Sequence, residues 1–239
     1  MIALLLLALQ ADADARFDRC AALARTDPAA ARADATRWRA EGGAWFARQC
    51  AGLAYAQERE WLAAASEFEA AARAAETGRD ARAANYWAQA GNAWLAAGEA
   101  AKARTALDAA LGSGALAGLQ RGEAQLDRAR ALVAAGDLDA ARTDLDAALK
   151  TADGDPLAWL LSATLARRMS NLPRARADIA QALRRAADDA SVQLEAGNIA
   201  ALGGDEDATR RAWAEAARLA PTSAEGRSAV AALKQFDAQ

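Results

Sequence analysis

The chain has 239 residues, a formal net charge of −3 and no histidine. The absence of histidine excludes Ser–His and Cys–His nucleophile pairs, histidine general bases and the commonest metal ligand. Acidic and basic residues are interleaved, as in Asp205-Glu206-Asp207 before Arg210-Arg211, which is typical of solvated helix faces with local ion pairs. Because no basic stripe with interleaved aromatic residues occurs, we expect no nucleic-acid partner.

Alanine dominates the composition, and only four prolines interrupt the chain. Alanine has the highest helix propensity, and long runs of the β-branched residues that favour strands are absent. The composition therefore predicts an all-α fold. By length alone, the chain fits one domain or two.

The first apolar stretch, Ile2–Leu9, carries no charge. A membrane-spanning helix needs about 20 residues, so this stretch is too short to span, but its length suits the hydrophobic region of a signal peptide. The triplets Ala11-Asp12-Ala13 and Ala13-Asp14-Ala15 have the A-x-A form that signal peptidase accepts. We expect residues 1–11 to be a signal peptide. Since no Lys or Arg precedes the stretch, the alternative is the first apolar turn of a capping helix.

Residues 12–43 are predicted to form an atypical N-terminal helical unit. One helix is expected at 16–26 and a second at 29–41, with Asp27-Pro28 as the break between them. Gly42-Gly43 ends the unit, because consecutive glycines punctuate a helical pattern.

Five similar series of small and large apolar residues follow. They start at Trp45, Ala84, Gly122, Pro156 and Ala190, so the last three starts lie 34 residues apart. The intervals between the first three starts are longer, and their extra residues fall near 77–81 and 112–118. Each series predicts two helices with a tight turn, since its apolar residues recur at helical spacing.

We expect a repeat array over residues 44–221, built from five helix pairs. The first pair lies within 45–76, and the others are 81–97 with 99–111, 122–135 with 137–151, 156–169 with 172–186, and 190–202 with 205–219. Residues 222–239 are expected to hold a C-terminal capping helix at 222–236, whose exposed side carries Glu225, Arg227, Lys234 and Gln235.

A 34-residue helix–turn–helix period resembles the tetratricopeptide repeat family. The resemblance covers roughly Trp45 to Pro221. It departs from the family pattern in places, since the tryptophan at the family's fourth position occurs only as Trp87 and Trp159, and the closing proline is clear only as Pro221. The resemblance implies a helix–turn–helix solenoid that winds into a right-handed superhelix.

In this family, inward residues of the first helices line a concave groove that holds an extended peptide or a partner helix. The family's groove positions can be carried over to this chain. Among the residues at these positions, we expect partner contacts at Phe46, Gln49, Asn85, Asn92, Arg130, Leu160, Arg167 and Asn198. The family's carboxylate clamp needs Lys or Arg at a position that Ala88 occupies here, so the sequence argues against a site for a C-terminal carboxylate. For Asn92 and Asn198, a polar groove lining without a dedicated ligand is an equal alternative.

Cys20 and Cys50 are the only cysteines. An even count together with a predicted export signal makes a disulfide the first hypothesis. In proteins that this chain resembles, first helices of adjacent units pack side by side, which would bring the two residues together. The alternative is two buried free thiols that act as small apolar residues.

The sequence contains no phosphate-binding loop, no metal-ligand set and no residue pattern of a catalyst. We therefore expect a non-catalytic scaffold without cofactor or metal, which binds a protein or peptide and is periplasmic or secreted. One alternative is a cytoplasmic adaptor of the same fold. Another is an accessory subunit of an envelope enzyme system that handles cell-wall glycan. The sequence does not indicate the oligomeric state.

Overall fold

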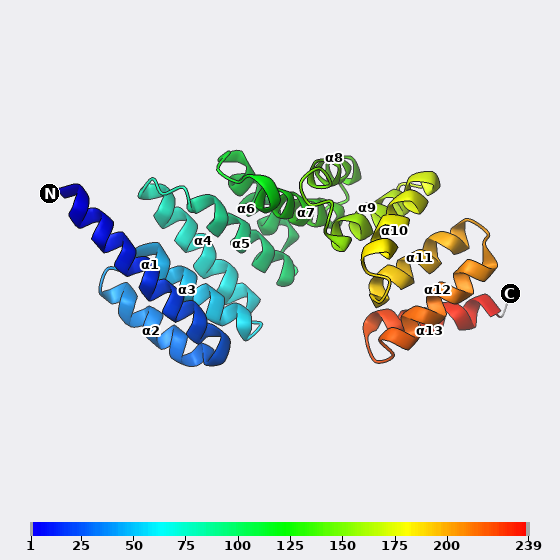
Figure 1. The fold of residues 1–239 in the computed structure, drawn as a ribbon, viewed down its shortest axis with the longest axis horizontal. Coiled ribbons are helices and arrows are strands. Elements are labelled where there is room, and N and C mark those ends of the chain that lie inside the picture. The colour runs from blue at the N-terminus through cyan, green and yellow to red at the C-terminus, as the bar shows by residue number, and fades with distance from the viewer. Residues whose placement is uncertain (1, 238–239) are drawn as a thin grey trace. The chain divides into compact units, whose positions relative to one another are not determined.

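The computed structural model describes the backbone of residues 2–237 and the side chains of residues 12–236. Its described residues form thirteen helices and no strand (Figure 1), which confirms the all-α prediction. The chain divides into two compact units, Met1–Gly136 and Asp137–Gln239, here called unit 1 and unit 2. The boundary falls within the third predicted repeat.

Unit 1 contains seven of these helices. Its bounds are α1 (Ile2–Thr26), α2 (Pro28–Ala40), α3 (Ala44–Gln57), α4 (Trp61–Thr77), α5 (Ala83–Ala96), α6 (Ala100–Gly112) and α7 (Gly118–Ala134). Neighbouring helices pack in chain order, and the first helices also meet, as α1 packs on α3 and α5 packs on α7.

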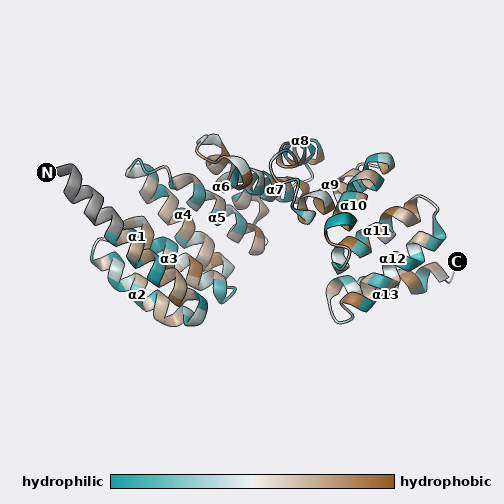
Figure 2. Ribbon diagram, viewed as in Figure 1, coloured by the Kyte–Doolittle hydropathy of each residue, from teal (hydrophilic) through white to brown (hydrophobic). Residues whose placement is uncertain are grey.

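Unit 2 contains the other six helices. They are α8 (Leu138–Ala148), α9 (Pro156–Arg168), α10 (Leu172–Arg185), α11 (Ala190–Leu202), α12 (Glu206–Leu219) and α13 (Ala224–Asp237). Helix α9 packs on α8, α10 and α11, and α13 covers α11 and α12. Figure 2 shows apolar and polar residues mixed along the same helices, as expected when each helix buries one face.

Side-chain caps fix where the helices of unit 2 begin. From α8 to α12, each helix starts after an Asp or Asn whose side chain accepts a hydrogen bond from a backbone N–H of the first turn; these caps are Asp137, Asp155, Asn171, Asp189 and Asp205. Such a cap satisfies one of the N–H groups that the helix leaves unpaired. Pro156 and Pro173 add a residue whose fixed φ suits the first turn.

The core repeats one packing device, in which a glycine of a first helix faces a large side chain of the second helix. A Cβ atom on Gly52 would lie 2.6 Å from the Phe68 ring, and one on Gly91 would lie 2.4 Å from Cγ of Leu107. Gly197 stands in the same relation to Trp213, at 2.3 Å. Missing Cβ atoms therefore let the two helices of a pair approach closely, and buried alanines fill most of the remaining core.

Two helix starts differ from the prediction by four residues or more. Helix α1 begins at Ile2 rather than at residue 16, and α7 begins at Gly118 rather than at Gly122. Leu116, just before α7, is 3% exposed and packs in the core of unit 1. The buried side chain anchors the chain next to the start of α7, and the connection from α6 is therefore shorter than expected. The side chains of residues 1–11, where the signal peptide is predicted, lie outside the described part of the structure.

None of the helices in the described part of the chain combines the length and the apolar character that a membrane span requires.

Candidate functional site

The first helices of three successive pairs in unit 1 line a hollow, here called the amide groove. It has a cavity volume of about 440 Å³ between α3, α5 and α7. Its lining consists of Gln49, Asn85, Ala88, Gln89, Asn92, Leu116, Gln120, Glu123, Ala124 and Asp127. Helical spacing explains the set, because residues three, four and seven positions apart share one face of α5 or α7.

Amide side chains give this groove its chemical character. The Gln49 amide Nε2 donates to Oε1 of Gln89 at 3.2 Å, which joins α3 to α5. Asn85 and Gln120 have no hydrogen-bond partner for their side chains among the described residues. Each amide carries both donors and an acceptor, so it can bond either an N–H or a C=O of a peptide backbone.

Two carboxylates lie at the α7 side of the groove. Asp127 accepts hydrogen bonds from Asn92, with Nδ2 at 2.9 Å, and from Arg130 on its own helix at 3.0 Å. Glu123 is exposed, and the lining contains no Lys or Arg. Because Arg130 pairs with Asp127, Glu123 is the carboxylate whose charge acts on a ligand here, and it opposes a carboxylate and favours a neutral or basic segment.

Four residues of the predicted groove set fall at or beside this hollow. Gln49, Asn85 and Asn92 line it. Arg130 is outside the lining but donates a hydrogen bond to the lining residue Asp127. Gln120 and Leu116 were missed because α7 was expected to start four residues later. The role of the four predicted residues in binding a partner stays a prediction.

The structure places Phe46 in the core of unit 1, and its contact with a partner stays a prediction. Its side chain is 8% exposed and packs with the rings of Phe17 and Trp38, whose centroids lie 6.2 Å and 6.0 Å away. The Arg82 guanidinium covers the ring at 4.4 Å. The N-terminal helices α1 and α2 therefore bury a residue that the family position would place toward a partner.

The predicted groove residues of unit 2 are bound within the fold. Arg167 holds Glu195 through two hydrogen bonds of 2.6 Å and 3.1 Å, and Glu195 is 6% exposed. Asn198 donates to Glu195 at 3.2 Å and accepts from the Trp213 indole at 3.1 Å. Leu160 packs against the apolar core of unit 2. Their side chains stabilise the packing of α9, α11 and α12, and their contact with a partner stays a prediction.

Cys20 on α1 and Cys50 on α3 lie next to each other in unit 1. Their Cα atoms are 5.9 Å apart, within the range that a disulfide requires, and their side chains are 1% and 0% exposed. Near the amide groove and elsewhere in the described part of the chain, no three His, Cys, Asp or Glu residues are placed so that they could hold a metal ion.

Comparisons with known proteins agree with this architecture. The family model described as tetratricopeptide repeat matches residues 122–165. PilW, a widely conserved type IV pilus biogenesis factor, is 17% identical, with a TM-score of 0.74 over 91% of this chain and 98% of PilW. No curated protein matches the chain in sequence.

Two further structures show the same fold. The pilF protein of Pseudomonas aeruginosa is 17% identical, with a TM-score of 0.71 over 92% of this chain and 99% of pilF. YrrB, a tetratricopeptide repeat protein with an unusual peptide-binding site, is 18% identical, with a TM-score of 0.59 over 79% of this chain and 91% of YrrB. The chain is therefore a helical-repeat protein of the tetratricopeptide fold, with a recognisable tetratricopeptide repeat at residues 122–165.

Proposed function

We propose that this chain is a non-catalytic scaffold that binds an extended segment of a partner protein in the amide groove. The observation that carries the proposal is the row of amide side chains that faces one hollow across α3, α5 and α7. An extended segment presents N–H and C=O groups along its length, and amides can pair with both. YrrB provides a precedent for peptide binding on this fold.

The segment is an internal or basic one rather than a free C-terminus. Glu123 repels a terminal carboxylate, whereas Arg130 offsets the charge of Asp127, and Ala88 stands where a clamp would need a cation. A Lys or Arg side chain on the partner would instead lie close to Glu123. Binding is then expected to weaken as the salt concentration rises.

We further propose that the scaffold works in the cell envelope after export. The predicted leader at residues 1–11 and the placement of Cys20 beside Cys50 support this compartment, because disulfides persist in oxidising environments. PilW is a pilus biogenesis factor, so pilus-assembly proteins are the first partners to test. The alternatives are a cytoplasmic adaptor and an accessory subunit of a cell-wall enzyme system.

The decisive experiment is cross-linked co-purification from the native host, with envelope and cytoplasmic fractions kept apart. One envelope protein that is recovered repeatedly would support the exported scaffold, and mass spectrometry of the chain would give its mature start near residue 12. Recovery from the cytoplasm alone would replace the exported scaffold by the adaptor.

A double substitution assigns the binding to the groove. Asn85→Ala with Asn92→Ala removes two amides from α5 and should reduce partner recovery at least tenfold. Gln57→Ala is the matched control, because Gln57 is an exposed amide at the end of α3 outside the groove. Equal recovery with both variants, at unchanged helicity, would place the binding surface elsewhere.

A further inference from the structure

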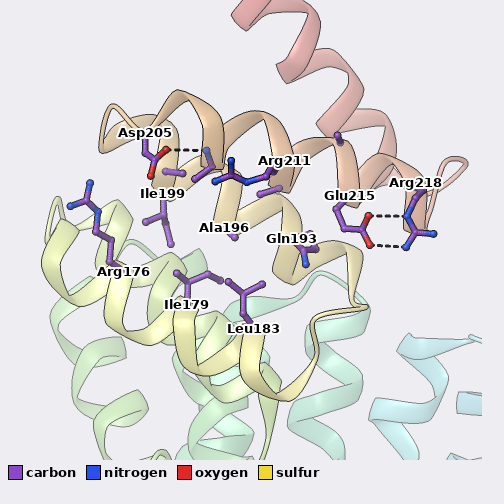
Figure 3. Close-up of a pocket in the computed structure, with 14 residues that line it drawn as sticks. Arg176, Ile179, Leu183, Gln193, Ala196, Ile199, Asp205, Arg211, Glu215 and Arg218 are labelled. Atoms are coloured by element: carbon purple, nitrogen blue, oxygen red, sulfur yellow. Dashed lines mark hydrogen bonds and ion pairs between the residues drawn. The ribbon is translucent and has the colours of Figure 1, made fainter.

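A second and larger hollow lies in unit 2, here called the arginine-rimmed groove. Its volume is about 970 Å³, and it is lined by α10, α11 and α12 (Figure 3). It opens on the opposite face of α11 from the predicted groove positions: Ala196 and Ala200 face it, whereas Asn198 stands two residues from each. Two residues along a helix correspond to a rotation of about 200°. This surface is therefore distinct from the face that the repeat pattern assigns to partners.

The inner surface of this groove is apolar on all three helices. Each helix contributes a pair of residues four positions apart, namely Ile179 and Leu183, Ala196 and Ala200, and Ala208 and Ala212. Ile179 of α10 and Ile199 of α11 are 5% and 1% exposed and pack in one core cluster, with Leu183 and Ala196 partly buried beside them (Figure 3). Such pairs form one stripe on each helix, and the small alanines let another backbone approach closely.

Three arginines and two carboxylates belong to the lining, so its charged side chains sum to +1. Arg218 pairs with Glu215 through two hydrogen bonds of 2.8 Å and 2.6 Å, whereas Asp205, which caps α12 by accepting from the backbone N–H of Ala208, keeps its charge. Among the described residues, Arg176 donates to a neutral acceptor, the carbonyl of Gly203 at 3.2 Å. Arg211 is exposed and has no carboxylate partner among the described residues.

We propose that the arginine-rimmed groove binds an amphipathic helix of a partner protein, with its apolar stripe on the groove floor and its carboxylates against Arg176 and Arg211. A helix fits this surface better than an extended strand. Gln193 is the one uncharged polar residue of the lining, and its amide already donates to the carbonyl of Ala187. An extended segment over the Ile, Leu and Ala residues would therefore bury unpaired backbone groups at a large cost, whereas a helix pairs its own. The proposal adds a second docking surface, in unit 2, to the amide groove of unit 1.

A synthetic peptide tests the chemistry directly. The probe is a fluorescent amphipathic helix of about 18 residues, five turns long, with leucines on one face and glutamates beside them. Fluorescence anisotropy at low salt should show binding to the full chain, and a scrambled peptide of equal composition should bind at least tenfold more weakly. Equal binding of the two peptides would overturn the proposal.

Charge reversal identifies the surface. Arg211→Glu, alone and with Arg176→Glu, should weaken binding of the acidic peptide at least tenfold and strengthen binding of a peptide in which lysine replaces glutamate. Arg168→Glu with Arg184→Glu is the matched control, since both arginines are exposed residues of unit 2 outside the groove. An equal loss in the control would reduce the effect to overall charge and overturn the assignment.

Two further readouts distinguish a partner helix in this groove from binding in the amide groove and from self-association. Asn85→Ala with Asn92→Ala should leave binding of the acidic helix unchanged, so failure of one groove does not imply failure of the other. Analytical ultracentrifugation of the chain alone should show the same oligomeric state for the parent and for Arg211→Glu. The contrary result is a dimer of the parent that Arg211→Glu abolishes. Such a dimer would mean that the groove is an interface between two copies, which would overturn the proposal of a separate partner.

Discussion

Asn92 on α5 donates its side-chain amide to Asp127 on α7, with Nδ2 2.9 Å from Oδ2, and this bond crosses the amide groove. Asp127 also holds Arg130 at 3.0 Å, so one carboxylate orients both residues. The amide oxygen of Asn92 has no donor among the described residues. It is therefore available to a backbone N–H of a bound segment.

The first prediction is that Asn92→Ala changes stability little. Asn92 is exposed, and a hydrogen bond in contact with solvent contributes about 1 kcal/mol or less to folding. Urea unfolding followed by circular dichroism should therefore give a free energy of unfolding within about 1 kcal/mol of the parent. A loss of several kcal/mol would show that the amide supports the fold. Weaker partner binding by this variant would then no longer indicate a direct contact.

The second prediction compares two Gly→Ala substitutions. At Gly91, a new Cβ would meet Leu107, which is fully buried, so Gly91→Ala should lower the free energy of unfolding by about 1–2 kcal/mol after the gain in helix propensity. At Gly112, nothing lies within 4 Å of the added carbon, so Gly112→Ala should be neutral or stabilise by up to about 1 kcal/mol. Equal unfolding midpoints for the two variants would contradict the packing argument.

The helices were predictable because their signals are local. Alanine propensity, the apolar period and caps such as Asp155 act within one or two turns, and the predicted and observed starts of α9 agree at Pro156. The side chain that packs against Gly91 was not predictable, because Leu107 of α6 reaches it only through tertiary packing.

The site was less predictable because neighbouring elements decide which side chains are free. Phe46 occupies a groove position by repeat register, yet α1 and α2 cover it. Arg167 and Asn198 meet through Glu195, which is 28 residues from Arg167 in sequence, so no local pattern reveals their pairing. The arginine-rimmed groove lies on the face of α11 that the repeat register does not assign to partners.

The third prediction concerns the partly buried pair of Arg167 and Glu195, in which the carboxylate is buried and the guanidinium is 26% exposed. Glu195→Gln keeps the shape but removes the charge that accepts from Arg167, so the free energy of unfolding should fall by about 1–3 kcal/mol. The matched control is Glu215→Gln on α12, whose pair with Arg218 is exposed, and it should change stability little. Urea unfolding measures both, and a larger loss in the control would contradict the role of burial.

The fourth prediction tests the proposed disulfide. A bond between Cys20 and Cys50 closes a loop with a sequence separation of 30, which should add about 3–4 kcal/mol by restricting the unfolded chain. A reductant should therefore lower the urea midpoint of the parent and leave Cys20→Ala/Cys50→Ala unaffected. If two thiols react with a labelling reagent in denatured, unreduced protein from its native compartment, the bond is absent and the case for export is weaker.

The fifth prediction follows from the burial of Tyr86 on α5. Desolvation of its hydroxyl raises the pKa from 10.0 to about 12, although the nearby positive charge of Arg82 acts in the opposite direction. The folded state therefore favours the protonated phenol. Its contribution to stability is complete below pH 10 and is lost as the pH rises from 10 toward 12.

Ultraviolet titration checks this directly. In a Tyr55→Phe background, Tyr86 is the only remaining tyrosine, since the chain has two. Its tyrosinate absorbance should rise at a higher pH in the folded protein than in urea, because only folding removes the phenol from water. A further change of Tyr86→Phe should remove part of the stability loss between pH 10 and 12. Coincident titration curves in the folded and unfolded states would contradict the predicted shift.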